Sequence, residues 1–280
     1  MSDVRPQNWL LISFDQWRGD WLDQPWLRLP VLRQLARQGW DLRRCYTSSP
    51  QCIPARVSWL TGQSPTSLGL TTNRSYSVSP SAPSFVRQLR DESGYRTVVV
   101  GKTHWTPHDE PCDLRDNLPL MEALGFDHVR EIAGPRAMRR IGCELADQWR
   151  DAGLLQSYRV DLQERYSNGC RHRVRPTVLP DALYPDLWLT GVALDELKKL
   201  PEDQPWLLWV SFPGPHEPFD VPAAWCRHRW IPDPEPRPSD PEVLRSAVQA
   251  SRALEKKLKS WPDGLPKDAV HALRQDYSNH

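Results

Sequence analysis

Short apolar runs and amphipathic segments alternate along the first third of the chain. The run 9–14 is apolar and stops at polar residues, as expected of a buried strand that delivers polar groups at its carboxyl end. Segment 30–39 has apolar residues at helical spacing, begins with proline and closes with glycine. Further helices are predicted over 54–61 and 84–92, and the latter leads into a strand at 97–100.

The pattern weakens in the middle of the chain and returns later. Residues 105–180 are rich in proline, arginine and cysteine and have weak periodicity, so we predict an irregular excursion with short helices. A helix over 186–200 and a strand over 206–210 follow, and two last helices are predicted over 242–259 and 267–277. The alternation of strands and helices predicts an α/β fold.

Size and charge narrow the classes of function. A chain of 280 residues with 39% hydrophobic content is expected to form one domain over 1–280. Its 36 basic and 35 acidic residues give a net charge of +1, so we expect no nucleic acid partner. We interpret the arginine clusters at 139–140 and 171–175 as solvated surface. No segment fits a signal peptide or a membrane span, so we expect no membrane association, a cytoplasmic location and no glycosylation of the sequon at 73–75.

The cysteines do not indicate a metal or disulfide framework. They have irregular spacing and no Cys-x-x-Cys pair, and we expect most of them to be buried thiols. The six are Cys45, Cys52, Cys112, Cys143, Cys170 and Cys226.

Polar groups follow three of the predicted strands. Asp15 and Gln16 follow the first, Lys102 and His104 the second, and His216 the third. Because an α/β sheet brings its strand ends to one edge, where such folds bind ligands, we expect these five side chains to meet.

Cys52 adds a candidate nucleophile. Pro54 suits the first turn of a helix and would leave Cys52 at or just before the N-cap, where free N–H groups and the helix dipole attract an anion. Arg56, four residues on, would lie on the same face and could clamp an oxyanion. The alternative is a buried cysteine in front of an ordinary helix.

The run Cys52–Arg56 is similar to the Cys-x-Pro-Ser/Ala-Arg signature of the sulfatases. Segments 14–20, 101–104 and 212–219 agree with that family in order and approximate spacing, so the chain resembles it over roughly residues 8 to 225. The resemblance implies an alkaline-phosphatase-like mixed sheet flanked by helices on both faces, of which this chain is the N-terminal portion.

The same resemblance implies that a separate maturation enzyme oxidises Cys52 to formylglycine, whose hydrated aldehyde attacks the sulfur of a small anionic sulfate ester. Asp15, Gln16 and the modified Cys52 would bind a divalent cation, typically Ca²⁺, with Mn²⁺ or Mg²⁺ as alternatives.

The remaining site residues have roles implied by the resemblance. Arg56 and Lys102 would position and neutralise the hydrated aldehyde and the sulfate. His104 would act as the base when sulfate is expelled, and His216 would help to protonate the leaving oxygen.

Two departures from the family pattern leave alternatives open. The late segment that supplies further metal ligands is not found, and Asp276 lies in the wrong context, so we expect a fragment of a longer enzyme, with a truncated or non-catalytic remnant as the alternative. Gln16 stands where many arylsulfatases have a second aspartate, which keeps a phosphonate monoester or phosphodiester hydrolase as the alternative activity. The natural substrate and the oligomeric state do not follow from the sequence.

Overall fold

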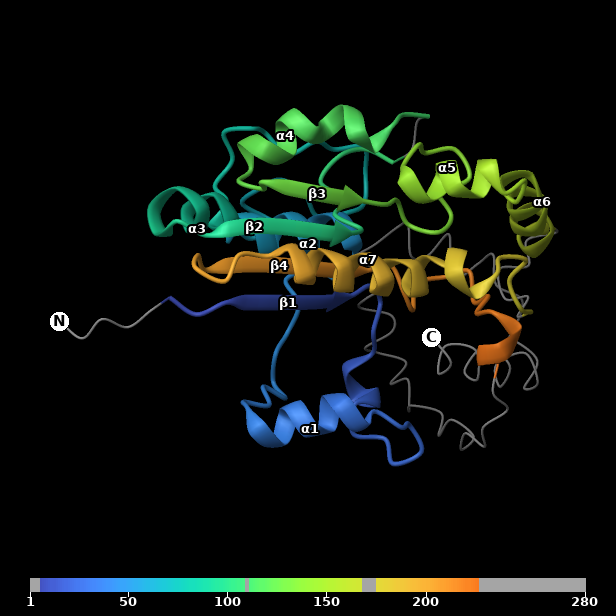
Figure 1. The fold of residues 1–280 in the computed structure, drawn as a ribbon, viewed down its shortest axis with the longest axis horizontal. Coiled ribbons are helices and arrows are strands. Elements are labelled where there is room, and N and C mark those ends of the chain that lie inside the picture. The colour runs from blue at the N-terminus through green and yellow to red at the C-terminus, as the bar shows by residue number, and fades with distance from the viewer. Residues whose placement is uncertain (1–5, 109–110, 168–174, 227–280) are drawn as a thin grey trace, which may run out of the picture.

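The computed structural model describes residues 6–108, 111–167 and 175–226, which form a parallel sheet with helices on both faces (Figure 1). The strands are β1 Trp9–Phe14, β2 Arg96–Gly101, β3 His128–Glu131 and β4 Trp206–Phe212, and their order in the sheet is β1-β4-β2-β3. The α-helices are α1 Pro30–Gln38, α2 Cys52–Thr61, α3 Phe85–Ser93, α4 Leu118–Ala123, α5 Glu144–Asp151, α6 Leu155–Arg165 and α7 Pro185–Lys199. Short 3₁₀ helices lie at η1 Gly19–Trp21, η2 Leu114–Asn117, η4 Asp181–Leu183 and η5 Ala223–Trp225. No helix in the described ranges is long and apolar enough to cross a membrane.

The strands and helices predicted around the motifs are confirmed. Strand β1 has the predicted bounds, and β2, β4, α1, α3 and α7 contain or nearly match their predicted ranges. Helix α2 begins at Cys52, two residues earlier than predicted, because Gln51 is the N-cap and Pro54 lies inside the first turn. Strand β3 and the positions of α4, α5 and α6 were not predicted. The predicted helices 242–259 and 267–277 lie outside the described residues.

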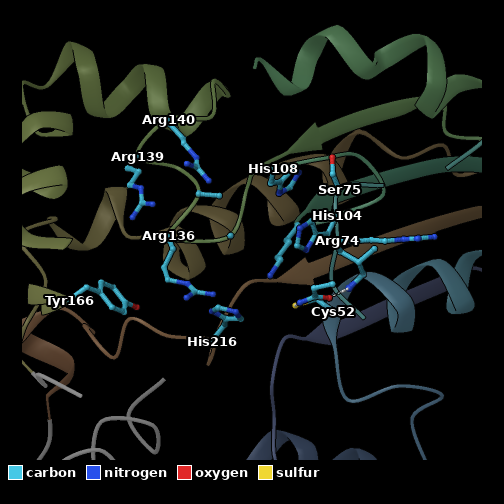
Figure 2. Close-up of a pocket in the computed structure, with 15 residues that line it drawn as sticks. Cys52, Arg74, Ser75, His104, His108, Arg136, Arg139, Arg140, Tyr166 and His216 are labelled. Atoms are coloured by element: carbon cyan, nitrogen blue, oxygen red, sulfur yellow. Dashed lines mark hydrogen bonds between the residues drawn. The ribbon is translucent and has the colours of Figure 1, made fainter. Parts of the chain in front are cut away.

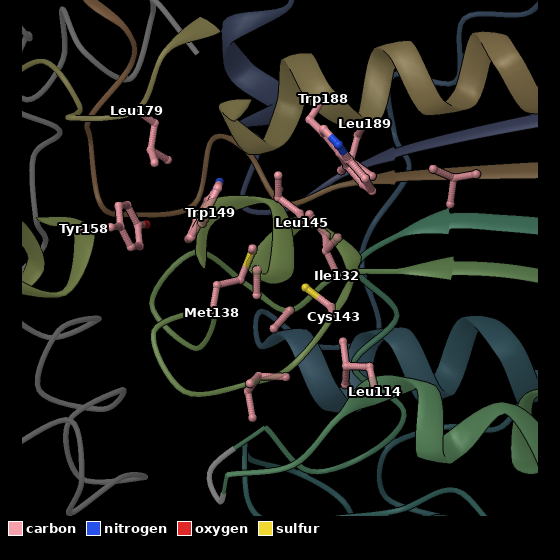
Figure 3. Close-up of a cluster of buried hydrophobic side chains, with 14 of the residues drawn as sticks. Leu114, Ile132, Met138, Cys143, Leu145, Trp149, Tyr158, Leu179, Trp188 and Leu189 are labelled. Carbon is pink, nitrogen blue, oxygen red and sulfur yellow. The ribbon is translucent and has the colours of Figure 1, made fainter. Parts of the chain in front are cut away.

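One face of the sheet packs against α5, α6 and α7. Alternate residues of the two central strands, Val98 and Val100 of β2 with Leu208 and Val210 of β4, point to this side. Figure 3 shows the aromatic part of this cluster, in which the rings of Trp149 and Tyr158 have centroids 4.5 Å apart. The packed side chains fix the segment that follows β3 against the sheet.

The opposite face carries α2 and α3. Val99 and Trp209 point to this side, where Val57 and Leu60 of α2 are fully buried. The ring of Trp105 contacts that of Trp209 edge-on, with centroids 5.4 Å apart. These buried residues anchor α2 to this face of the sheet.

A glycine brings β2 and β4 close together at that edge. Gly101 has φ +108°, and a Cβ atom there would come within 2.0 Å of the Ser211 carbonyl oxygen. The backbone N–H of Lys102 donates to the same oxygen over 2.9 Å. A side chain at position 101 would therefore push apart the strand ends that carry the polar groups.

Strand β1 forms an edge of the sheet in the described part of the chain. It pairs with β4 alone, and Trp9, Leu10 and Ile12 are 49%, 51% and 45% exposed. Helix α1 lies apart from the sheet on this side and contains no buried residue (Figure 1).

The expectation that most cysteines are buried is wrong for the five that the structure describes. Cys143 is buried, Cys45 and Cys112 are exposed, and Cys52 and Cys226 are intermediate. All five are free thiols, as the absence of a disulfide pattern predicted.

Candidate active site

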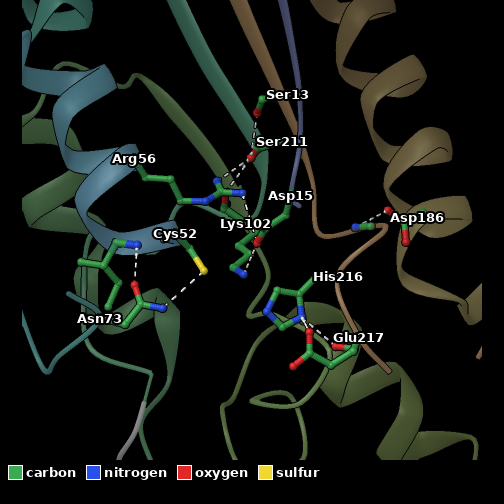
Figure 4. A network of polar contacts seen from close by, with 12 residues as sticks. Ser13, Asp15, Cys52, Arg56, Asn73, Lys102, Asp186, Ser211, His216 and Glu217 are labelled. Carbon is green, nitrogen blue, oxygen red and sulfur yellow. Dashed lines mark hydrogen bonds and ion pairs between the residues drawn. The ribbon is translucent and has the colours of Figure 1, made fainter. Parts of the chain in front are cut away.

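The thiol of Cys52 lies at the first turn of α2 and is held by a neighbouring loop (Figure 4). Asn73 accepts the backbone N–H of Ile53 over 3.0 Å, and its Nδ2 donates to the Cys52 sulfur over 3.7 Å. The Asn73 side chain therefore positions the thiol and occupies one N–H group of the helix N-terminus. The sequence marked Asn73 only as part of a sequon, and its role depends on a loop contact twenty-one residues away.

A buried ion cluster lies behind the thiol. Asp15, at the end of β1, contacts the ammonium group of Lys102, and its Oδ2 lies 3.6 Å from an Arg56 nitrogen. Arg56 also donates to the hydroxyl of Ser211 over 2.8 Å and to the Lys102 carbonyl. Two cations thus face one carboxylate, and the excess positive charge favours an anionic ligand.

Charge and burial act in opposite directions on Asp15. Burial would raise the pKa of its carboxyl group, but the charges of Lys102, Arg56 and His216 outweigh burial and lower the pKa. The carboxylate is therefore ionised at neutral pH.

His216 is oriented by the loop after β4. Its Nδ1 lies 2.7 Å from the Glu217 carbonyl oxygen, which can only accept, so this nitrogen carries a proton. The loop is fixed in turn by Asp186, which accepts the backbone N–H of Gly214 over 3.0 Å. Burial raises the pKa of Asp186 to about 6.

His104 stands at the end of β2 with φ +59°, in the left-handed region. Its ring stacks on that of His108 with centroids 4.5 Å apart, and its buried Nδ1 has no hydrogen-bond partner among the described residues. Burial and the nearby Lys102 charge hold the pKa of His104 far below its ordinary range, so the ring is neutral at neutral pH.

A second buried polar pair supports this histidine. His108 Nε2 lies 4.0 Å from Glu131, which accepts the Thr103 hydroxyl. Burial raises the pKa of Glu131 to about 7 and lowers that of His108 to about 3. Neither His108 nor Glu131 could be singled out from the sequence, because their burial depends on the unpredicted strand β3.

Asp15, Cys52 and His216 present ligand atoms that all lie within 4.8 Å of one another. The carboxylate of Asp15 suits a hard divalent cation, and so does the side-chain carbonyl oxygen of the adjacent Gln16. Gln16 is exposed and has φ +69°. Ca²⁺ takes roughly six to eight oxygen ligands, so these residues fit part of a coordination shell.

The thiol of Cys52 is set up to ionise near neutral pH. Burial would raise its pKa, but the hydrogen bond with His216 and the charge of Lys102 outweigh burial and lower the pKa to about 7.

We therefore expect unmodified, metal-free protein to react with iodoacetamide at Cys52 with a half-maximal rate near pH 7. A free cysteine in a peptide has a pKa of about 8.5 and serves as the reference. Peptide mapping by mass spectrometry would follow the site. In Lys102→Gln the midpoint is expected to rise, and a wild-type midpoint at the peptide value would contradict the electrostatic role of the lysine.

The thiol opens onto a cavity of about 590 Å³ (Figure 2). The cavity is lined by Cys52, Ile53, Asn73, Arg74, Ser75, Lys102, His104, His108, Gly134, Arg136, Ala137, Arg139, Arg140, Tyr166 and His216. Four of the predicted site residues, Cys52, Lys102, His104 and His216, thus share one cavity wall. Asp15 and Arg56 lie behind that wall and contact it through Lys102.

The arginines at 139–140 are exposed, as interpreted from the sequence, and they also line this cavity. Arg175, from the second cluster, is in ion pairs with Asp161 and Glu164. The other residues of that cluster lie outside the described ranges.

Residues 7–230 match the family model described as Sulfatase. An arylsulfatase from Clostridium perfringens is 30% identical over 224 residues, which are 78% of this chain and 45% of the relative. A choline-sulfatase from Rhizobium meliloti is 28% identical over 233 residues, which are 78% of this chain and 40% of the relative. The fold is similar to that of a phosphonate monoester hydrolase from Agrobacterium radiobacter, with a TM-score of 0.63 and 21% identity over 98% of this chain and 56% of that one. The chain therefore spans about half the length of these proteins, or less.

Proposed function

The chain belongs to the sulfatase family, and from that premise we propose that it forms the catalytic half of a sulfuric ester hydrolase in which Cys52 is converted to formylglycine. One observation carries the proposal. Cys52 opens onto a cavity whose lining includes lysine, arginine and histidine and no acidic residue among those described. Such a wall suits an ester that carries negative charge before and during cleavage.

The modified residue would supply a hydrated aldehyde, whose hydroxyl oxygen attacks the ester and whose second hydroxyl allows sulfate to be released. Asn73, which donates to the sulfur of Cys52, is placed to hold one of these hydroxyl groups. Lys102 would neutralise the ester oxygens. Arg56 donates to the Lys102 carbonyl and pairs with Asp15 outside the cavity lining, so in this proposal it positions these two residues.

Two histidines would move the protons. His104 would be the base that takes a proton as sulfate departs, because its ring lines the cavity and its Nδ1 has no hydrogen-bond partner among the described residues. His216 lies beside Cys52 and would donate a proton to the leaving oxygen. A divalent cation held by Asp15 and Gln16 would polarise the ester oxygens when bound.

The test follows maturation and turnover together. In protein from a host with the maturation enzyme, the peptide that contains Cys52 is expected to lose about 18 Da, and the protein is expected to hydrolyse 4-nitrophenyl sulfate. Protein from a host without that enzyme is the control. It should keep the Cys52 thiol and should not hydrolyse 4-nitrophenyl sulfate. A thiol that persists in the first host, or a modified protein without turnover, would contradict the proposal.

The adjacent Gln16 favours a second candidate, hydrolysis of a phosphonate monoester or phosphodiester through the same nucleophile. Comparing 4-nitrophenyl sulfate with 4-nitrophenyl phenylphosphonate separates the two. We expect kcat/KM to be higher for the sulfate by at least about tenfold. The reverse preference would select the second candidate, and turnover of either ester would exclude a non-catalytic remnant.

A further inference from the structure

The side of the cavity away from Cys52 carries a row of arginines. Figure 2 shows Arg136, Arg139 and Arg140 there, across the cavity from the thiol. Arg136 forms an ion pair with Glu217 over 3.2 Å. Arg139 and Arg140 are exposed and have no ion pair in the described part of the chain.

Hydrogen bonds hold the backbone beneath these arginines. The segment forms consecutive turns, in which the N–H groups of Met138 and Ile141 donate to the carbonyls of Gly134 and Ala137 over 3.1 Å. Met138 and Ile141 are 1% exposed and belong to the hydrophobic cluster on the α7 face. Because these two side chains point inward, Arg139 and Arg140, which lie between them, must point outward.

Neighbouring elements hold the turn on both sides. Arg159 of α6 donates to the Arg139 carbonyl over 2.7 Å, and the hydroxyl of Tyr158 donates to the Pro135 carbonyl over 3.2 Å. The guanidinium groups are therefore presented from a packed scaffold, which limits the entropy lost when they bind a ligand.

A third polar group on this side lacks a partner. The Tyr166 hydroxyl lines the cavity, is buried, and has no hydrogen bond within the described ranges. Like the two arginines, it offers a donor to an acceptor that enters the cavity.

We propose that Arg139 and Arg140 bind a second oxyanion on the leaving-group portion of the substrate, so that the substrate is an ester carrying at least one further sulfate or carboxylate. Guanidinium groups pair with both oxyanions through two parallel hydrogen bonds, and no described acidic residue of the cavity wall competes. The inference rests on the proposed function for the position of the first oxyanion, beside Cys52 and Lys102.

The test measures binding of arylsulfonates, which are not hydrolysed. Isothermal titration calorimetry at fixed ionic strength would compare 2-naphthalenesulfonate with 2,6-naphthalenedisulfonate, 4,4′-biphenyldisulfonate and 6-sulfo-2-naphthoate. We expect at least one dianion to bind about 10- to 100-fold more tightly than the monosulfonate. The disulfonate and the carboxylate arms tell which oxyanion the arginines prefer.

The double variant Arg139→Gln/Arg140→Gln is expected to remove this preference and leave monosulfonate binding within about twofold. The control Arg28→Gln/Arg44→Gln makes the same charge change at exposed residues outside the cavity lining and should keep the preference. Equal affinities for all probes, no binding of any probe, or a preference that survives in the first variant would each overturn the inference. Turnover of a simple aryl sulfate without a dianion preference would remove the inference and leave the proposed function intact.

Discussion

Replacement of Cys52 by alanine is expected to lower kcat/KM for 4-nitrophenyl sulfate by about four to six orders of magnitude, the range seen when a catalytic nucleophile is removed. The physical reason is that only the residue at position 52 lies at the first turn of α2 beside Lys102 and His216, and the alanine side chain has no group that could attack the ester. His104 and Lys102 would still bind the ester and leave a small residual rate. Steady-state kinetics on protein from a host with the maturation enzyme would measure the effect.

The variant is expected to keep its fold, because Cys52 is incompletely buried and alanine suits a helix. Cys45→Ala is the matched control, since it removes an exposed thiol outside the cavity and should leave kcat/KM unchanged. A Cys52→Ala protein that retains more than about a hundredth of the wild-type rate would show that the reaction does not use this residue as nucleophile.

Replacement of Asp15 by asparagine is expected to lower the free energy of unfolding by about 3 kcal/mol at pH 7, because Lys102 and Arg56 would remain buried without their carboxylate. Urea denaturation followed by circular dichroism would measure the change. The control Asp195→Asn removes an exposed ion pair with Lys198 and should cost less than about 1 kcal/mol.

The pH dependence gives a second check on the same variant. Since the pKa of Asp15 is lowered by folding, its contribution to stability is present above the unfolded value of about 3.9 and is lost as the pH falls below it. The stability difference between wild type and Asp15→Asn should therefore shrink below about pH 4. A difference that stays constant down to pH 2 would show that the carboxylate charge is not the cause.

The elements around the site could be predicted because each carries a local signal. The apolar run of β1 ends abruptly at Asp15, and Pro54 with Gly62 marks the extent of α2. Parallel strands then bring Asp15, Lys102 and His216 to one edge whatever the loops do. The pattern of strand ends was therefore sufficient to predict that these polar groups lie close together.

The rest of the site depends on contacts between distant segments. Asn73 reaches Cys52 from a loop without regular structure, and Glu131 is buried at the end of a four-residue strand too short to show a period. Arg139 and Arg140 are surface residues, as the sequence predicted, but nothing local shows that they line the cavity or that Met138 and Ile141 anchor their turn. Sequence periodicity predicts which face of an element is buried, and it does not predict which loops meet.

The exposed edge of β1 is a site where the protein is expected to associate with other chains. Its outer row of backbone N–H and C=O groups has no partner strand in the described ranges, and Leu10 and Ile12 stand exposed on one face. A strand from another chain that paired here would cover those side chains and form hydrogen bonds with the unpaired backbone groups of β1. At high concentration we expect copies of the chain to associate through this edge, and a charged residue at position 10 or 12 should reduce that association.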